Sequence, residues 1–147
     1  MVSEIINTEI GLFKIKYKGK KIIEAKFIKK YEGKLTKKTK SFVHKYFSGE
    51  LHYLNADLKI EGTSFQKSVW HEISKIPYGK TKTYGEIAKA IGSAGAARAV
   101  ANACGQNKLS IFIPCHRVVG TKNIGGYHFG IDKKTWLLKL ENDYISK

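Results

Sequence analysis

Apolar and polar residues alternate from residue 10 to residue 28, and this period of two is typical of a β-strand with one buried face. Turn-forming residues at 18–20 interrupt the alternation, so we expect a β-hairpin in this part of the chain. Residues 35–48 then carry apolar side chains at helical spacing, and Gly49 follows as a stop signal, which predicts a helix. Residues 51–60 are expected to form an extended crossover.

The next part of the chain carries two helix start signals. Thr63 with Gln66, and Thr83 with Glu86, each have the spacing of a capping box, in which two side chains accept hydrogen bonds from backbone N–H groups at the start of a helix. The first predicted helix ends near Pro77. The second is short and ends at a glycine.

A turn at residues 93–95 then leads into an alanine-rich helix at residues 96–103. Two short helices joined by a glycine-containing turn are the outline of a helix-turn-helix. Near the end of the chain, Asp132 is expected to cap a helix that packs behind the cysteine segment. The apolar face of this helix would carry Trp136, Leu137, Leu140 and Tyr144.

These elements predict a mixed fold of the α/β (α+β) class. We expect a small N-terminal lobe, made of a β-hairpin and a helix over residues 1–60, with a structural role. Residues 61–147 are expected to form a mainly helical lobe that holds the helix-turn-helix and the active-site cysteine. A chain of 147 residues is long enough to bury a core without a cofactor.

The chain is strongly basic, with 27 Lys plus Arg against 12 Asp plus Glu and a formal net charge of +15 at pH 7. Such an excess favours polyanions, so nucleic acid is the first partner to test. A lysine-rich surface that serves solubility, or a hot habitat, is the alternative. Because we see neither a signal peptide nor an apolar run of membrane-spanning length, we expect a cytoplasmic protein without a membrane partner. We also expect a monomer.

The segment from Ile111 to Gly120, IFIPCHRVVG, places a cysteine in a setting that indicates chemistry. An apolar run leads to Pro114, whose fixed φ favours a buried strand or rigid turn that presents Cys115 at a defined place. His116 and Arg117 follow, and both can favour a thiolate, the nucleophilic form of cysteine. A structural role is the alternative, since free cysteine is often buried as a small hydrophobe.

For Cys104, inside an alanine run, the structural role is the interpretation we prefer. Two cysteines eleven residues apart, with no C-x-x-C pair, make a poor zinc site and an unlikely disulfide. We therefore expect free thiols, no metal and no cofactor. Three histidines show no partner pattern and are expected to be structural: His44, His52 and His71.

Arginine occurs only twice in the chain, as Arg98 and Arg117, and both residues lie in the stretch around Cys115. Lysine supplies the positive charge everywhere else in the chain, so these two positions indicate a need for the planar, forked guanidinium group of arginine. Arg98 is the one long side chain in a helix of small residues that could approach DNA closely. It could enter a base stack or a narrow groove there. An alanine face packed on a core is the alternative.

The motif Pro114-Cys115-His116-Arg117-Val118 resembles that of the O6-alkylguanine-DNA alkyltransferases. The resemblance extends at matching spacings from about Gly62 to Glu141, and it is only architectural in the first third of the chain. It implies direct DNA repair, in which an alkyl group, chiefly methyl, passes irreversibly from guanine O6 in duplex DNA to the protein. O4-alkylthymine is a further possible substrate of the same kind.

The resemblance also implies roles for single residues. Cys115 would be the alkyl acceptor, and His116 would link its thiol, through a water, to Glu141. Asn107 would be a hinge that positions the active-site turn, and Tyr84 would crowd the target phosphate and donate a hydrogen bond to guanine. Taken singly, His116, Glu141 and Tyr84 could each be structural, but together at this spacing they favour a site.

DNA contacts are implied for the second helix of the helix-turn-helix, with Arg98 as a finger that fills the gap left by an everted nucleotide. The expected contact set is Arg98, Tyr84, Ala96, Ala97, Ala101 and Arg117. Tyr127 matches the pocket tyrosine of the family, whereas His128 and Phe129 replace small residues. These bulkier side chains predict a tighter pocket that favours methyl over benzyl groups, and a lid that moves differently is the alternative.

The expected chemistry consumes the protein, because the thioether formed on Cys115 offers no good leaving group. An O6-alkyl group inside the stack can be reached only after the base leaves the duplex. One alternative is a lesion-binding protein that resembles the non-catalytic alkyltransferase-like proteins, which carry Trp at the acceptor position. A cysteine hydrolase is a second alternative, although its Cys and His usually come from distant segments.

Overall fold

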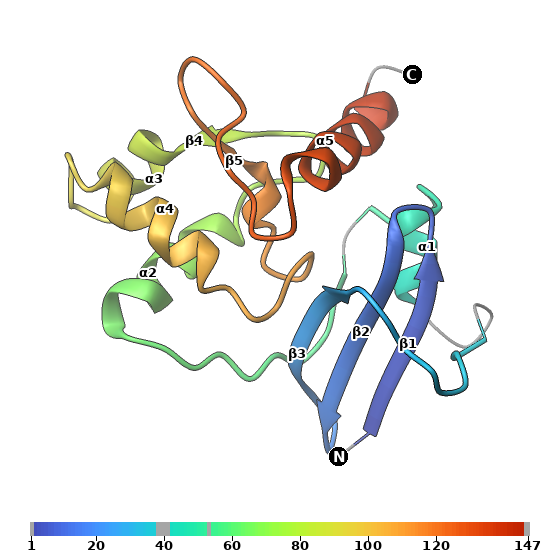
Figure 1. Cartoon of the computed structure of the whole chain (residues 1–147). Coiled ribbons are helices and arrows are strands. Elements are labelled where there is room, and N and C mark those ends of the chain that lie inside the picture. The colour runs from blue at the N-terminus through green and yellow to red at the C-terminus, as the bar shows by residue number, and fades with distance from the viewer. Residues whose placement is uncertain (1, 38–41, 53, 146–147) are drawn as a thin grey trace. The chain divides into compact units, whose positions relative to one another are not determined.

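The computed structural model of the chain describes residues 2–37, 42–52 and 54–145 (Figure 1). The chain forms two compact units, one made of Met1–Lys59 with Lys108–Phe112 and the other of Ile60–Asn107 with Ile113–Lys147. The predicted mixed α/β class is confirmed. The separate roles assigned to residues 1–60 and 61–147 stay predictions.

The first unit is built on a three-stranded antiparallel sheet with the order β1-β2-β3, drawn in blue in Figure 1. The strands are β1 (Val2–Thr8), β2 (Gly11–Lys18) and β3 (Lys21–Ile28). The pair β2 and β3 confirms the predicted hairpin, and β1 is a further strand that the alternation did not reveal. Register pairs such as Phe13 with Phe27 put alternate side chains of both strands into one core.

The helix predicted at residues 35–48 is shorter in the structure, where α1 spans Val43–Phe47. Leu35 is 42% exposed and lies outside a helix, so it contributes no apolar face, and residues 38–41 of the predicted helix lie outside the described part. The ring of Phe47 packs edge-on against Phe13 and Phe27, at 5.4 and 6.0 Å between centroids. In the following segment, Leu58 forms an isolated parallel bridge with Ile22; the extended crossover expected at residues 51–60 stays a prediction, and residue 53 lies outside the described part.

The second unit contains the predicted helices α2 (Ser64–Ile73), α3 (Tyr84–Ala90) and α4 (Ala97–Gly105). Both capping boxes are confirmed: the Thr63 and Thr83 hydroxyls accept from the third residue of their helices, whose side chains accept in return. A turn that contains Gly92 and Gly95, both at positive φ, separates α3 from α4 and completes the helix-turn-helix. The Trp70 indole donates to the Ala103 carbonyl at 2.9 Å and ties α2 to α4.

Two short strands, β4 (Lys82–Thr83) and β5 (Val118–Val119), pair in parallel just before α3 and just after the cysteine segment. The last helix, α5, spans Ile131–Ile145 and packs against the cysteine segment, as expected. Asp132 lies in its first turn and not at the predicted cap position, because the helix already begins at Ile131 after Gly130 at positive φ. No helix among the described residues has both the length and the apolar character needed to cross a bilayer.

Candidate active site

Cys115 opens a one-turn 3-10 helix, η2 (Cys115–Arg117), directly after Pro114. The preceding residues form a buried turn, with Ile111 held at a φ of 74° that a β-branched residue rarely adopts. The Cys115 side chain is buried, and it lies on the wall of a cavity of about 170 Å³. The other residues that line this cavity are Tyr84, Ala101, Cys104, Gly105, Gly126, Tyr127 and His128.

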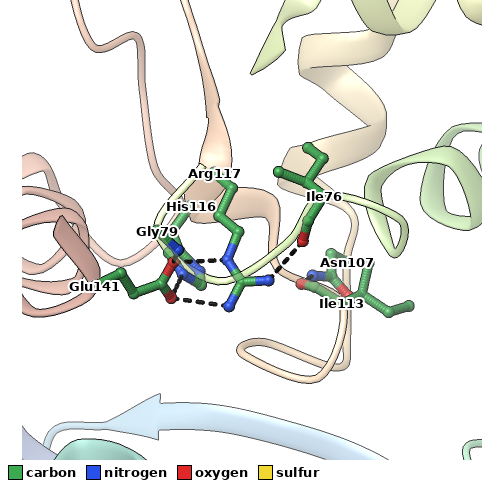
Figure 2. Close-up of polar contacts among 7 residues, drawn as sticks. All are labelled: Ile76, Gly79, Asn107, Ile113, His116, Arg117 and Glu141. Carbon is green, nitrogen blue, oxygen red and sulfur yellow. Dashed lines mark hydrogen bonds and ion pairs between the residues drawn. The ribbon is translucent and has the colours of Figure 1, made fainter. Parts of the chain in front are cut away.

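A buried polar network lies beside the cysteine and is centred on the Glu141 carboxylate of α5 (Figure 2). The His116 Nε2 atom lies 2.6 Å from Glu141 Oε2. Arg117 donates from Nε to Glu141 Oε1 at 2.7 Å and from Nη2 to Oε2 at 3.0 Å, and its Nη1 donates to the Ile76 carbonyl at 2.7 Å. The Gly79 N–H adds a bond to Oε1 at 3.2 Å. The carboxylate is thus held from two segments of the second unit, the cysteine segment and the turn at Gly79.

The charges in this network follow from burial and pairing. Burial alone would raise the pKa of Glu141, but the hydrogen bonds and charges of His116 and Arg117 outweigh it and hold that pKa well below its usual range. Burial lowers the pKa of His116, although the bond to Glu141 acts against this. His116 is therefore a neutral ring near pH 7. With Nε2–H donated to the carboxylate, its Nδ1 carries the lone pair and can accept a proton.

The thiol of Cys115 is protonated at rest. Its hydrogen bond with Cys104, together with burial, raises the pKa of Cys115 well above its ordinary value, while the Asn107 amide and the Lys134 charge act in the other direction. This differs from the thiolate that the Cys-His-Arg pattern predicts, because the His116 and Arg117 side chains are both turned toward Glu141. Deprotonation of Cys115 must therefore accompany the reaction.

Asn107 lies at the end of the alanine-rich helix segment and connects to the cysteine turn. Its Nδ2 group donates to the Ile113 carbonyl at 2.9 Å and to Cys115 Sγ at 3.3 Å. The amide therefore fixes the backbone just before Pro114 and also touches the sulfur. This contact is compatible with the positioning role expected for Asn107.

Tyr84, the first residue of α3, reaches the same cavity, and burial raises the pKa of its hydroxyl. Its hydroxyl lies 3.5 Å from the Gly126 carbonyl. A side chain at Gly125 would collide with the tyrosine, since an added Cβ would lie 2.5 Å from that hydroxyl. The glycines in this loop thus let its backbone approach the Tyr84 ring.

Lys134 of α5 is a site residue that sequence reasoning missed. Its side chain is fully buried, and Nζ donates to the Val118 carbonyl at 2.6 Å, to the Gly126 carbonyl at 2.9 Å and to the Tyr84 hydroxyl at 3.4 Å. Burial lowers the pKa of Lys134 to about 8, although the two cysteine sulfurs act against this. Its spacing with Leu137 and Glu141, which puts a lysine on the buried face of a helix, was the available signal.

The alanine-rich helix presents Arg98 to solvent, and Ala96, Ala97 and Ala101 are partly exposed along it. Ala101 also lines the cavity. Arg117 is only 7% exposed, and its guanidinium bonds to Glu141 and Ile76, so the DNA contact expected for it stays a prediction. Arg117 supports the site from inside.

The loop after β5 supplies the other wall of the cavity. Tyr127 and His128 line it, whereas Phe129 contacts both of their rings, at centroid distances of 5.8 and 4.9 Å. Of the histidines expected to be structural, His52 bonds the Gly49 carbonyl at 3.1 Å, His71 is exposed on α2 and His44 is half-buried in α1. None of these three is among the residues that line the cavity.

Known proteins are similar to this chain in sequence and in fold. A family model described as the DNA-binding domain of 6-O-methylguanine DNA methyltransferase matches residues 64–143. A protein of Acanthamoeba polyphaga mimivirus, named as a probable methylated-DNA–protein-cysteine methyltransferase, is 52% identical over 144 residues, which are 96% of this chain and 97% of that protein. A Methanosarcina acetivorans protein named methylated-DNA–protein-cysteine methyltransferase is 54% identical over 97 residues, or 65% of this chain and 62% of that protein.

Among solved structures, Mycobacterium tuberculosis OGT in complex with DNA matches with a TM-score of 0.86 and 36% identity, over 96% of this chain and 92% of that chain. The resemblance drawn from the Pro-Cys-His-Arg-Val motif is therefore confirmed. Because the family model covers more than half of the chain and the mimiviral relative matches nearly all of it, the chain belongs to the O6-methylguanine-DNA methyltransferase family.

Proposed function

We propose that this protein repairs DNA by moving an alkyl group, chiefly methyl, from O6 of guanine to the sulfur of Cys115, once per molecule. One observation carries the proposal: Cys115 lies on the wall of a small cavity and is flanked in sequence by the buried His116–Arg117–Glu141 network. The relatives named as methylated-DNA–protein-cysteine methyltransferases support it.

The first step is removal of the thiol proton. Because the neutral His116 ring donates Nε2–H to Glu141, its other nitrogen accepts the Cys115 proton, through a water as the family resemblance implies. The imidazolium that forms lies against the Glu141 carboxylate, which stabilises it. Arg117 keeps that carboxylate ionised and oriented.

The second step is displacement at the alkyl carbon. The Cys115 sulfur forms a bond to this carbon while the bond from carbon to guanine O6 breaks, and the electron pair stays with the guanine. Tyr84 donates a hydrogen bond to the departing base, which relieves its growing negative charge. Lys134, bonded to the Tyr84 hydroxyl, holds that donor in place and adds a positive charge near the sulfur.

Access to the lesion requires that the nucleotide leave the duplex, because the alkyl group on O6 lies at the base-pairing edge of guanine, where the sulfur cannot line up behind the alkyl carbon while the base is stacked. The helix-turn-helix of α3 and α4 is the element we assign to DNA binding. Arg98 projects from its second helix and would fill the vacated place in the stack. The net charge of +15 adds sequence-independent attraction to the backbone.

The bulky residues after Tyr127 set the substrate range in this proposal. His128 lines the cavity and Phe129 packs on its ring, so methyl is favoured over benzyl. We also propose that the protein is cytoplasmic, since its thiol acceptor must stay reduced. In this proposal it acts as a monomer and needs no cofactor.

The test is a titration of limiting protein with duplex DNA that carries O6-methylguanine. We expect the number of restored guanines to reach one per protein molecule and then stop. A Cys115→Ala variant should bind the same DNA and restore none. Continued turnover would contradict the proposal, and so would binding by the wild type without restoration, which is the behaviour of a lesion sensor.

A further inference from the structure

Cys104, near the end of α4, lies on the wall of the same cavity as Cys115. Their sulfurs are close enough for each thiol to shift the pKa of the other. Transfer to Cys115 does not use this second sulfur, and a purely structural cysteine would not need to reach the cavity. Val100 and Ala103 already fill the buried positions of the helix. Cys104 is therefore a nucleophilic group that the proposed mechanism leaves without a task.

We propose that Cys104 and Cys115 form a redox pair, in which a hydroperoxide oxidises the two neighbouring thiols in the cavity to an intramolecular disulfide. Reduction by a dithiol would restore both thiols. Formation of this disulfide is inferred from the cavity that the two cysteines share and does not depend on the proposed function. Its consequence, a reversible loss of the alkyl acceptor, rests on the proposed function.

The turn between the two cysteines explains how residues eleven apart in sequence come together. Asn107 and Ile113 lie at the two ends of this turn, and the Asn107 amide bonds the Ile113 carbonyl at 2.9 Å. The same amide donates to Cys115 Sγ at 3.3 Å, which holds that sulfur on the cavity wall. Spacing along the chain made a disulfide look unlikely, because it carries no information about this closed turn. A short closed loop costs little further entropy to bridge.

The surroundings favour reaction at Cys104 first. The hydrogen bond from Cys115 lowers the pKa of Cys104, although burial acts against it, and the Lys134 charge lowers it further. Cys104 is also only half-buried, whereas Cys115 is buried. A thiolate with access to solvent is the form that attacks peroxides. Hydrogen peroxide is little larger than water, so a cavity of about 170 Å³ admits it.

The reaction balances in two steps. The Cys104 thiolate attacks one oxygen of the hydroperoxide, the O–O bond breaks, and sulfenic acid forms on Cys104 with release of hydroxide or alkoxide. The Cys115 sulfur then attacks the sulfenic sulfur, expels hydroxide and gives up its proton, so that water leaves. In sum, two thiols lose two hydrogens and the peroxide is reduced.

Such a pair would protect the acceptor. A lone Cys115 that met peroxide could pass through sulfenic acid to sulfinic and sulfonic acids, which thiols cannot reduce. A disulfide with Cys104 stops this sequence at a reversible stage. An already alkylated Cys115 has no thiol to contribute, so the disulfide would form only in protein that can still act.

The full chain itself permits a direct test. Trypsin cuts after Arg98, Lys108 and Arg117, so Cys104 and Cys115 fall into separate peptides, 99–108 and 109–117. After hydrogen peroxide and blocking of free thiols, we expect a mass loss of about 2 Da in the intact protein and a linked pair of these peptides. Dithiothreitol should separate the pair. This readout needs no DNA, so it is independent of the proposed function.

A Cys104→Ser variant supplies the comparison, and each protein is measured against its own rate before oxidation. With enough peroxide to carry a lone thiol past sulfenic acid, the wild type should recover a fraction of transfer activity roughly fivefold greater than the variant after dithiothreitol. In the variant, peptide 109–117 should carry sulfinic or sulfonic acid.

Three results would overturn the proposal: no linked peptides in the wild type, a link only between two molecules, or irreversible oxidation of Cys115 while Cys104 stays a thiol. If the peptides link but the reduced protein transfers no alkyl group, the redox pair stands and the proposed function fails. If the variant does not fold, the peptide map of the wild type decides alone.

Discussion

At the scale of single residues, Glu141 organises the candidate site. One carboxylate accepts hydrogen bonds from His116, Arg117 and the Gly79 backbone, and all of these groups lie in the interior or close to it. Removing one partner of a buried ion pair commonly costs about 3–5 kcal/mol, because the other charge is left unpaired. The network therefore links stability and chemistry through the same atoms.

A Glu141→Gln substitution should lower both the stability of the protein and its rate of alkyl transfer. We expect a stability loss of about 3 kcal/mol at pH 7 and a transfer rate lower by about 10²-fold or more. The folded pKa of Glu141 is lowered, so its stabilisation is present above the unfolded pKa of about 4.3 and is lost as pH falls toward the folded value. The advantage of wild type over variant should thus shrink below about pH 4.

Urea unfolding at several pH values and single-turnover kinetics measure these effects. Glu32→Gln is the matched control, since Glu32 is exposed on a loop and should behave as wild type. An advantage that grows on acidification would contradict the assigned role of the carboxylate.

Lys134 gives a second prediction at this scale. With a pKa of about 8, it loses its charge as pH rises above that value, so the wild-type transfer rate should fall there. Lys134→Met should be slower by about 10-fold at pH 7 and should lack this alkaline fall. The control is Lys139→Met, which removes an exposed cation of the same helix. Equal pH profiles for wild type and Lys134→Met would rule out the assigned role.

At the scale of elements, two capping boxes of the same design start α2 and α3. The two helices differ in their first residues, because α3 begins with Tyr84, whose ring reaches the cavity, whereas α2 begins with residues away from it. A cap fixes the first turn of a helix. The box at Thr83 therefore positions a site residue, while the box at Thr63 has a structural effect alone.

Thr83→Ala and Thr63→Ala form a matched pair of variants. Each should lower the free energy of unfolding by about 1 kcal/mol, the usual cost of a lost cap. Only Thr83→Ala should also slow alkyl transfer, since only it loosens Tyr84. Denaturant unfolding and single-turnover rates check the pair, and an equal slowing in both variants would refute a positioning role for the α3 cap.

The helix α4 carries a prediction of its own. Arg98→Ala should slow transfer from duplex DNA more than transfer from the free base, because only the duplex must be opened and its gap filled. Lys89→Ala removes an exposed cation from the neighbouring α3 and serves as the control. If Arg98→Ala slowed both substrates to the same degree, its role as an intercalating finger would be wrong.

At the scale of the whole molecule, the sequence predicted what local patterns determine. The hairpin, both capping boxes and the helix-turn-helix follow from spacings within a few residues, and the structure contains them. The helix expected at residues 35–48 is shorter, because an apolar residue such as Leu35 needs a surface to pack on and here lies exposed.

The sequence did not reveal the features that depend on tertiary contacts. Arg117 points inward because a carboxylate 24 residues away receives it. Cys104 and Cys115 line the same cavity because a closed turn returns the chain. Lys134 is charged and yet buried, since two carbonyls and a tyrosine hydroxyl surround its amine. The helical spacing of Lys134 with Leu137 and Glu141 indicates burial, but the pattern along the chain does not reveal these bonding partners.

The most direct test of the central claim uses duplex DNA whose O6-methylguanine carries a deuterated methyl group. After incubation under reducing conditions, we predict a mass gain of about 17 Da in the intact protein. Peptide mapping should place the whole gain on Cys115 in peptide 109–117 and leave Cys104 unlabelled. An unlabelled Cys115, or a label on any other residue, would contradict the account.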